Sequence, residues 1–368
     1  MCQQCLLKKQ YNDILFFMSR RPTLKQVAEK AGVSLGMAGR VLGNYGYYSE
    51  STKKKVLDAA KAISYTPNVI ARSLRTRVTK TIGVLISDIT TFFWTTLVRG
   101  IQDKAGKEGF SVILCNSDEE SKNEQLYLST LFERSVDGLI VSPTPHNHSY
   151  LKKLSRGMVP IVLVDRRVKG LRVPTIKTDN QAGAYEAASH LISLGHDRIA
   201  IITGIQGVET SDERFAGYRQ ALREKGIPLR KTLIKEGNFQ KDQAFSATKE
   251  FLRMKRPPSA IFVCNEPMVS GCILALKDSS LRIPEDIAVI GFDDPIWASY
   301  TDPPLTTVSQ PSYTMGILAF DYILAQISNK RKDSKYLEDI ILKPTLVVRE
   351  SCGTRLKEHE DHLAQKKP

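Results

Sequence analysis

Most of the chain alternates short apolar runs with longer stretches in which apolar residues recur every three or four positions. The seven clearest apolar runs cover residues 82–86, 111–115, 138–141, 161–164, 199–202, 260–263 and 287–290. Helical patterns lie between them, for example over residues 94–108, 180–194, 212–225 and 267–279. Short strands that are buried on both faces and separated by helices are typical of parallel sheets with right-handed crossovers. Roughly eleven such units exceed one ordinary sheet, so the pattern predicts an α/β core of two doubly wound parallel-sheet lobes.

The pattern is purely helical near the N-terminus, between residues 23 and 42. Thr23 can cap the start of a first helix, with Gln26 completing a capping box. Gly32 suits the left-handed position that ends this helix, and Ser34 can cap a second helix. Two short helices joined by a glycine-containing turn predict a small all-α helix-turn-helix headpiece. Its second helix would enter the major groove of DNA, with its N-terminal side chains on base edges.

A third helix is expected over residues 49–64, and Lys53, Lys54 and Lys55 lie in its first half. Basic residues near the start of a helix interact unfavourably with the helix dipole, so a contact with phosphate would explain their position better. An ordinary solvated face is the alternative interpretation of these three lysines.

A short helix is expected to follow, with Thr66 as its cap and Pro67 in its first turn, and to end near Arg75. One or two turns are too short to be stable alone, so this segment should order only against DNA or a partner. Leu74 lies between Arg72 and Arg75 with no core to enter. An apolar side chain flanked by arginines is typical of a wedge that enters the minor groove.

Charge is concentrated at the same end of the chain. The 368 residues carry a net charge of +14, and the first 80 hold 15 Lys and Arg against 4 Asp and Glu. About one fifth of the chain therefore carries most of the excess positive charge, which suggests a nucleic-acid-binding end on a nearly neutral body. A solvated basic tail is the alternative.

The overall composition indicates a cytoplasmic globular protein, because 42% of the residues are hydrophobic and no apolar run approaches the length that crosses a bilayer. We expect no membrane association. The six cysteines do not form a disulfide ladder, and Cys2 and Cys5 make a lone C-x-x-C with no second pair nearby, so no metal or other cofactor is predicted. No nucleophile elbow, dinucleotide fingerprint, P-loop or zinc-protease motif is present, so an enzyme is not expected.

Four segments together resemble the lactose-repressor (LacI/GalR) family of bacterial transcription regulators: TLKQVAEKAGVS, RVLGN, SYTPNVIARSLRT and KTIGVLISD. The resemblance extends over about residues 22–350. It implies a DNA-binding headpiece, a hinge helix and a periplasmic-binding-protein-like core, acting as a homodimer on a pseudo-palindromic double-stranded operator. Met18 looks like a natural start for this family, so residues 1–17 are interpreted as an extension from an upstream start codon.

The resemblance places Leu35 and Gly36 at base-reading positions, Arg40 at a further base or phosphate position, and Leu74 at the hinge wedge. The full set of predicted DNA-binding residues is Thr23, Ser34, Leu35, Gly36, Arg40, Asn44, Lys53, Leu74 and Arg75.

The predicted recognition helix departs from the family pattern. Met37-Ala38-Gly39 stands where the family usually has Thr-Val-Ser, and Gly36 often corresponds to a polar residue. Each glycine inside a helix costs about 1 kcal/mol relative to alanine, so this helix should be looser and its operator different. A sugar sensor with weakened or lost DNA binding is therefore an alternative function.

Ligands of open α/β sheets bind at the carboxyl ends of strands, and polar and aromatic residues follow several of the predicted strands. The resemblance favours the same places. The predicted effector-binding residues are Phe93, Trp94, Asp165, Arg166, Arg214, Asn265, Asp293 and Trp297. Aspartate, asparagine and arginine beside aromatic platforms suit a small sugar or sugar derivative.

Two details of this predicted site change the ligand that it would suit. Arg166 and Arg214 together would suit an acidic or phosphorylated sugar, although Asp165 and Asp293 partly cancel their charge. Glu266 stands where the family commonly has aspartate, and its longer side chain puts that contact in doubt. The same fold would also serve a sugar-binding protein that feeds a transporter, but the basic leading segment and the lack of a signal peptide argue against it.

The chain is expected to cross between the two lobes three times, near Asp179, near Gln310 and within residues 329–336. The tail carries only Leu356 and Leu363 a heptad apart, which predicts a dimer and no tail-driven tetramer. The expected divisions are an extension (1–17), the headpiece (18–66), the hinge helix and linker (67–80), a core N-subdomain (81–179 plus 310–332), a core C-subdomain (180–309 plus 333–352) and a charged tail (353–368).

Overall fold

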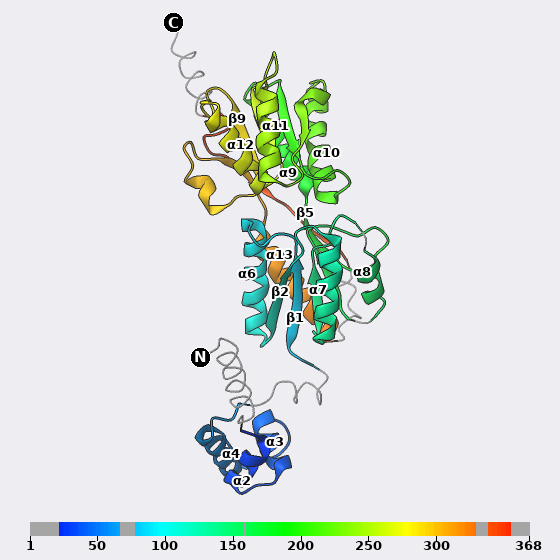
Figure 1. The fold of residues 1–368 in the computed structure, drawn as a ribbon, viewed down its shortest axis with the longest axis vertical. Coiled ribbons are helices and arrows are strands. Elements are labelled where there is room, and N and C mark those ends of the chain that lie inside the picture. Colours follow the sequence, from blue (N-terminus) through cyan, green and yellow to red (C-terminus); the bar gives the residue numbers. More distant parts are fainter. Residues whose placement is uncertain (1–21, 67–77, 147, 158, 329–337, 355–368) are drawn as a thin grey trace, which may run out of the picture. The chain divides into compact units, whose positions relative to one another are not determined.

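The computed structural model describes residues 22–66, 78–146, 148–157, 159–328 and 338–354. The chain divides into two compact units, Met1–Thr79 and Lys80–Pro368 (Figure 1). The predicted hinge residues Leu74 and Arg75, the predicted extension and residues 355–368 of the tail lie outside the described residues. In the part of the chain that is described, no helix has the length and hydrophobicity to span a membrane.

The first unit is the helix-turn-helix that the sequence predicts. It contains α2 (Leu24–Ala31), α3 (Leu35–Gly43) and α4 (Glu50–Ala62). A hydroxyl side chain caps each helix, because Thr23, Ser34 and Ser49 accept hydrogen bonds from the backbone N–H groups of the first turns. The three helices bury one small core, whose centre holds Val27, Ala38 and Val56.

The second unit begins with a lobe built on a six-stranded, wholly parallel sheet. Its strand order is β11-β5-β4-β3-β1-β2. The strands are β1 (Thr81–Ile86), β2 (Ser111–Asn116), β3 (Gly138–Val141), β4 (Ile161–Val164), β5 (Thr175–Thr178) and β11 (Ile340–Leu342). Its helices are α6 (Phe92–Lys107), α7 (Ser121–Glu133), α8 (Ser149–Leu154) and α13 (Ser312–Ile327).

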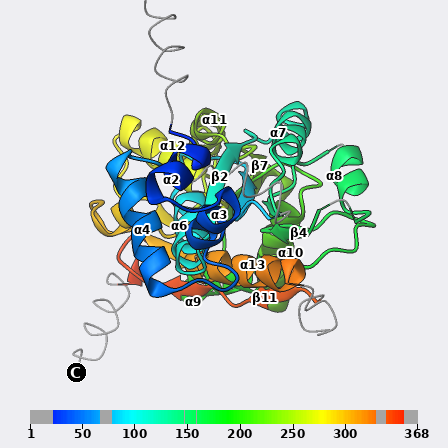
Figure 2. The same cartoon turned by 90° about the horizontal axis from the view of Figure 1, so that it is seen from below.

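Helices cover both faces of this sheet, because side chains alternate along each strand. Ile82, Val84 and Ile86 of β1 pack with α6 and α13, while Leu85 packs with α7 and α8 on the other face. Helices α6 and α13 lie side by side (Figures 1 and 2), and the glycines Gly100 and Gly316 allow the close approach. A side chain at either glycine would collide with the backbone of the facing helix.

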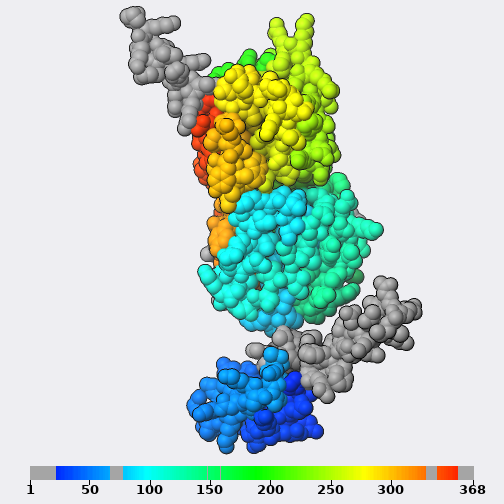
Figure 3. Space-filling model, turned by 60° about the vertical axis from the view of Figure 1, so that its left-hand side comes forward, coloured from blue at the N-terminus to red at the C-terminus, as the bar shows by residue number. Residues whose placement is uncertain are grey.

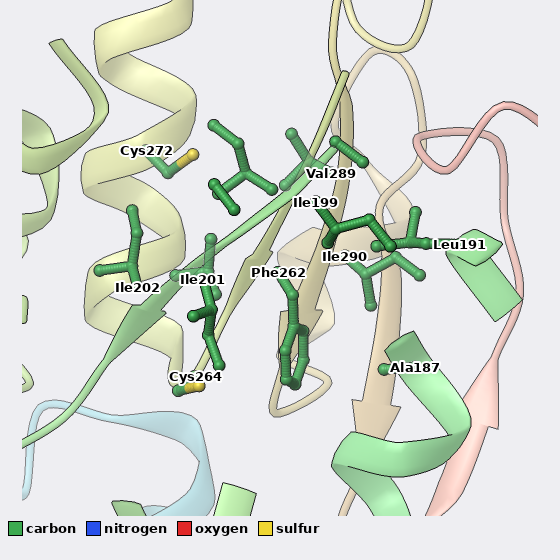
Figure 4. Packing of buried hydrophobic residues seen from close by; sticks show 14 of the residues in the cluster. Ala187, Leu191, Ile199, Ile201, Ile202, Phe262, Cys264, Cys272, Val289 and Ile290 are labelled. Carbon is green, nitrogen blue, oxygen red and sulfur yellow. The ribbon is translucent and has the colours of Figure 1, made fainter. Parts of the chain in front are cut away.

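The second lobe repeats the design, with strand order β12-β10-β9-β8-β6-β7 and only β12 antiparallel to its neighbour. Its strands are β6 (Ile199–Thr203), β7 (Ile234–Glu236), β8 (Ala260–Val263), β9 (Ala288–Phe292), β10 (Thr306–Ser309) and β12 (Thr345–Val347). Its helices are α9 (Asn180–Ser193), α10 (Glu209–Glu224), α11 (Lys241–Leu252) and α12 (Glu266–Asp278), with 3-10 turns η1 (Lys231–Leu233) and η2 (Ile296–Ser299). Its core is aliphatic around Phe262, with Cys264 and Cys272 buried as free thiols (Figure 4).

The chain passes from the first sheet to the second lobe between β5 and α9, and returns between β10 and α13. The predicted third crossing within residues 329–336 is wrong. Residues Ile340–Leu342 form β11, which pairs in parallel with β5 of the first lobe. The chain crosses only at Lys343 and Pro344, before β12 joins the second sheet. The core C-subdomain therefore gains its last segment later than the predicted residue 333, because a short apolar strand completes the first sheet beforehand.

Candidate functional site

A cavity of about 350 Å³ lies between the two lobes, at the carboxyl ends of their strands. Residues from both lobes line it, and most are polar, acidic or aromatic. They are Ser87, Asp88, Thr91, Phe93, Trp94, Asp118, Glu119, Asp165, Arg166, Thr210, Arg214, Phe239, Gln240, Asn265, Pro267, Asp293 and Gln310. Seven of the eight residues that the sequence predicts for the effector site are among them.

Asp165 and Arg166 follow β4 on the first-lobe side of the cleft, and both are buried. The Arg166 guanidinium donates through Nη1 and Nη2 to both oxygens of Glu119, at 3.0 and 2.7 Å, and through Nε to Asp165 at 3.1 Å. Burial alone would lower the pKa of Arg166, but the charges of Glu119 and Asp165 outweigh it and raise that pKa. Arg166 is therefore a charged group held by two carboxylates of its own lobe.

Two aromatic side chains form the apolar part of the first-lobe wall. Phe93 and Trp94 lie in the first turn of α6, directly beyond β1, and their rings meet edge to face at 4.7 Å between centroids. Both are buried in the core of the first lobe and also reach the cleft. An aromatic face at this place can contact the apolar side of a sugar ring.

Arg214 reaches the cleft from α10 on the second-lobe side. Its Nε donates to the Asn180 side chain at 2.8 Å, and its Nη1 donates to the carbonyl of Cys264 at 2.5 Å. The guanidinium stacks on the ring of Phe292 at 3.8 Å from the centroid. These contacts fix a planar, cationic group in a buried position, where it can present donors to a ligand.

Asp293 follows β9 and is almost completely buried. Its carboxylate accepts hydrogen bonds from the Gln310 side chain at 2.6 Å and from the backbone N–H of Glu266 at 3.3 Å. Burial raises the pKa of Asp293, and the charge of Arg214 partly opposes that rise. Gln310 lies where the chain returns to the first lobe, so Asp293 is tied directly to one of the crossings.

Asn265 and Glu266 begin α12 and have different roles. The Asn265 side chain caps the helix by accepting from the backbone N–H of Met268, and it also lines the cleft. The Glu266 carboxylate instead accepts from the backbone N–H of Phe92 at 2.7 Å, across the junction between the lobes. The longer side chain of glutamate thus connects the second lobe to the start of α6, where the two lobes are in contact (Figure 3).

Trp297 is the one predicted effector residue that does not line the cleft. It lies on the η2 turn, and its indole N–H donates to the second oxygen of Glu266 at 3.0 Å. The prediction placed it in the cleft because it follows the β9 strand closely. The chain instead turns away from the cleft after Asp293, and the indole contacts Glu266 outside the cavity.

A second set of charged groups joins the lobes beside the first crossing. Lys177 of β5 is only 1% exposed, and its Nζ donates to Glu209 at 2.7 Å and to Glu213 at 2.5 Å, both on α10. Arg167 donates to the same Glu209 through its backbone N–H and its side chain. The hydrogen bonds from Lys177 and Arg167 keep the pKa of Glu209 low although burial alone would raise it.

The cleft also contains unusual backbone geometry. Asp118, Glu119, Asp165 and Asp293 all have positive φ angles, between 52° and 77°. This left-handed conformation is unfavourable for residues with a side chain and persists only where the surrounding structure requires it. Four acidic residues in this conformation around one cavity indicate a site shaped to hold carboxylates in fixed positions.

Sequence reasoning missed several lining residues, chiefly Asp88, Asp118, Glu119 and Phe239. The signal for three of them was present. Asp88 comes two residues after β1, and Asp118 and Glu119 come just after β2, which is the same strand-end position that singled out Asp165 and Asp293. Phe239 follows the short strand β7, which the apolar pattern did not reveal.

The predicted DNA-binding residues of the first unit lie on and beside α3. Leu35 is 54% exposed, and Gly36 and Arg40 are also exposed, so the first turns of α3 present an open surface. Thr23 and Ser34 use their hydroxyl groups as helix caps. Asn44 ends α3 in a left-handed conformation and accepts from the Tyr48 hydroxyl at 2.6 Å.

Lys53 forms an ion pair with Glu50 one turn earlier in α4, at 3.3 Å. The side chain of Lys53 is still 41% exposed. An exposed pair of this kind contributes little to stability, so Lys53 stays available for another anion, and its contact with DNA remains a prediction.

Comparison with known families gives two matches along the chain. Residues 23–68 match the family of bacterial regulatory proteins of the lacI type, and residues 188–352 match a periplasmic binding protein-like domain. The probable helix-turn-helix-type transcriptional regulator EndR of Paenibacillus polymyxa is 38% identical over 334 residues, which are 89% of this chain and 98% of that protein.

The solved structures that are similar to this chain include transcriptional regulators. The lac repressor dimer bound to operator and the anti-inducer ONPF has a TM-score of 0.81 and 27% identity, covering 90% of this chain and 99% of its own. The transcriptional regulator CelR in complex with cellobiose has a TM-score of 0.67 and 30% identity, covering 90% of this chain and 100% of its own.

Proposed function

This chain belongs to the lacI family of bacterial regulatory proteins and is a DNA-binding transcriptional regulator, and we propose that it is a repressor controlled by a small sugar-like effector bound between its two core lobes. The DNA-binding unit is the capped helix-turn-helix of α2 and α3. The effector site is the cleft lined by Arg214, Asp165 and Asp293.

The observation that supports the effector most directly is the composition of the cleft. Carboxylates, an asparagine and a fixed arginine line the same cleft as the aromatic pair Phe93 and Trp94. Hydroxyl groups of a sugar pair with such polar groups, while the apolar side of its ring contacts an aromatic face. The structurally similar regulator CelR is in complex with cellobiose, so neutral mono- and disaccharides are the first ligands to test.

The DNA partner is proposed to be a pseudo-palindromic operator that two copies of the chain contact together. A homodimer places two α3 helices in successive major-groove half-sites, with Leu35 and Arg40 on base edges or phosphate. Leu74 of each copy would enter the minor groove at the centre of the operator. The protein would act in the cytoplasm, where the chromosome lies, and the cleft would bind its ligand without catalysing a reaction.

Ligand and operator are proposed to be coupled through the junction of the lobes. The described residues cross that junction three times, and Glu266 and Lys177 each form a hydrogen bond between the lobes. A ligand that changes the angle between the lobes would also change the position of the first lobe. The predicted hinge segment precedes that lobe in the chain. By thermodynamic linkage, ligand and operator must change each other's affinity by the same factor.

The effector site is tested by replacing Arg214 and measuring the ligand response on operator DNA. A ligand is first selected from neutral mono- and disaccharides by its effect on the anisotropy of a fluorescent operator complex. Arg214→Ala should abolish the response at ligand concentrations that saturate the wild type, while operator affinity changes little. The midpoint of urea denaturation of the full-length chain shows whether the core of the variant is folded.

Arg219→Ala provides the matched control, because Arg219 lies on the same helix but is exposed. This variant should respond to the ligand as the wild type does. An equal ligand response in Arg214→Ala and Arg219→Ala would contradict the assignment of the cleft.

A further inference from the structure

The charges that line the cleft are unbalanced. Five carboxyl groups and two guanidinium groups face it. The acidic residues are Asp88, Asp118, Glu119, Asp165 and Asp293, and the basic residues are Arg166 and Arg214. Because a narrow cavity with low-dielectric walls concentrates the field of its charges, this lining favours neutral or cationic ligands over anions.

Arg166 does not offset this imbalance for a ligand. Each of its three nitrogens already donates to a carboxylate, two of them to Glu119 and one to Asp165. The side chain of Arg166 is 7% exposed and that of Glu119 is 20% exposed, so the pair is largely shielded from solvent. Two N–H donors of the guanidinium remain, but two carboxylates already compensate its charge, so a phosphate or carboxylate on a ligand would compete with Glu119 for Arg166.

Backbone geometry holds Glu119 in this position. Asp118 and Glu119 are consecutive residues with φ angles of 52° and 58°, both in the left-handed region. This turn leads from β2 into α7, and it directs the Glu119 carboxylate toward an arginine 47 positions later in the chain. The hydrogen bonds between Glu119 and Arg166 best explain why two successive residues keep an unfavourable conformation.

The remaining charges do not restore the balance. The hydrogen-bond partners of Asp88, Asp118 and Asp293 are neutral: a threonine, an asparagine, and a glutamine with a backbone amide. Arg214 is held by neutral oxygens and by an aromatic ring, so it contributes one positive charge. This arrangement disfavours the acidic or phosphorylated sugar that the two arginines suggest in the sequence.

We propose that Glu119 determines the charge selectivity of the cleft: by occupying the Arg166 guanidinium, it makes the cleft accept neutral or cationic polyhydroxylated ligands and reject phosphorylated or carboxylated ones. This proposal rests on the assignment of the cleft as the effector site. It names Glu119 as a specificity-determining residue.

The test uses inorganic sulfate as the probe, with the full-length chain and ionic strength held constant with sodium chloride. Isothermal titration of the wild type should show no saturable sulfate binding. Glu119→Gln removes the competing charge and leaves Arg166 with Asp165 alone, so sulfate should bind at least about tenfold more tightly than to the wild type. Adding Arg166→Met to Glu119→Gln should remove that gain.

Glu133→Gln is the matched control, because it removes the same charge from an exposed position at the end of α7 in the same lobe. It should bind sulfate no better than the wild type. The proposal is wrong if Glu119→Gln gains no more than Glu133→Gln. It is also wrong if the wild type binds sulfate and loses that binding with Arg166→Met.

A second measurement needs no variant and covers the case in which Glu119→Gln does not fold. The thermal midpoint of the wild type is compared in matched concentrations of glucose, glucosamine and glucose 6-phosphate. Glucose 6-phosphate should stabilise the protein no more than sodium sulfate of equal ionic strength does. A larger stabilisation by glucose 6-phosphate than by glucose or glucosamine would overturn the proposal.

The two proposals fail separately in these experiments. Operator binding by the wild type without ligand tests the regulator function and does not depend on Glu119. Intact operator binding with a cleft that prefers anions would refute only the charge selectivity. Absent operator binding with the expected sulfate results would refute the regulator function and leave the selectivity of the cavity standing.

Discussion

Glu266 connects the two lobes beside the cleft. It accepts from a backbone N–H at the start of α6 in the first lobe and from the indole of Trp297 in the second. A carboxylate at a helix N-terminus is favoured by the helix dipole. Burial nevertheless raises the pKa of Glu266, and the charges of Asp293 and Asp88 raise it further. Burial of Glu266 at the junction of the lobes therefore disfavours its charged form, although the hydrogen bond from Phe92 partly opposes this effect.

The raised pKa of Glu266 predicts a pH-dependent stability. The folded-state pKa lies above the usual value of 4.5, so the stabilising contribution is present below pH 4.5 and is lost as pH rises through the folded-state pKa. Glu266→Gln keeps the size of the side chain and removes the titration. Chemical denaturation should show that the wild type loses stability relative to Glu266→Gln as pH rises above 4.5. Parallel profiles for the two proteins over that range would contradict this explanation.

The sequence predicts seven of the residues that line the cleft, but it does not predict which side chains pair there. Arg214, Asp165 and Asp293 follow from strand ends and family resemblance, because those positions converge in any sheet of this kind. The pairing of Glu119 with Arg166 depends on a left-handed turn and on contact between residues 47 positions apart. Neither can be predicted from one sequence.

Among the elements, α3 departs most from the family pattern, because it begins Leu-Gly-Met-Ala-Gly. The structure forms this helix in full, with Ser34 as its cap and Asn44 at its end. Nothing lies within 4 Å of the position that a side chain at Gly36 would take. Gly36 therefore has no packing role among the described residues of this unit. It lowers the helix propensity of α3 and offers no side chain on the exposed surface.

Replacing Gly36 by alanine should stabilise α3 by about 1 kcal/mol, because alanine has the higher helix propensity and meets no obstacle. Hydrogen exchange of the full-length chain, followed on the amides of α3, measures this as slower exchange. Gly32→Ala is the matched contrast, since Gly32 has a φ of +63° and also has nothing within 4 Å. That variant should destabilise the same unit by about 1–2 kcal/mol. Similar effects of the two substitutions would show that backbone conformation is not the deciding factor.

The elements that sequence reasoning missed are short and share one reason. The strands β5, β7, β10, β11 and β12 have only three or four residues, and β5 and β10 are rich in threonine. Strands β5 and β10 are buried, whereas β7, β11 and β12 lie at the edges of their sheets and are only partly buried, so none of the five stands out as a long apolar run. The missed strand β11 is also why the third crossing was predicted too early.

The whole core is one unit of two similar lobes joined by three crossings and by charged contacts at the junction. The cluster of Lys177, Glu209 and Glu213 lies beside the first crossing, with the ammonium group almost completely buried. A buried ion pair adds little net stability, yet removal of one partner is expensive because the other charges stay behind. The same groups would have to rearrange if a ligand changes the angle between the lobes.

Lys177→Met should therefore destabilise the core by about 3 kcal/mol, the lower end of the range for a broken buried pair. Lys343→Met is the control, because Lys343 is 78% exposed and pairs with Glu186 at the surface; it should change stability by less than about 1 kcal/mol. Urea denaturation of the full-length chain measures both. Equal losses of stability would mean that the Lys177 cluster does not hold the lobes together.

The central claim is that this chain recognises a specific DNA sequence through a recognition helix with few polar groups. The most direct test is fluorescence anisotropy of the purified protein on duplexes from its own upstream region and on scrambled DNA, at two salt concentrations. We expect tight, selective binding whose preference for the upstream duplex persists at the higher salt. Weak binding without preference and with a steep loss at the higher salt would mean that only the phosphate contacts remain, and the chain would then be a sugar sensor without an operator.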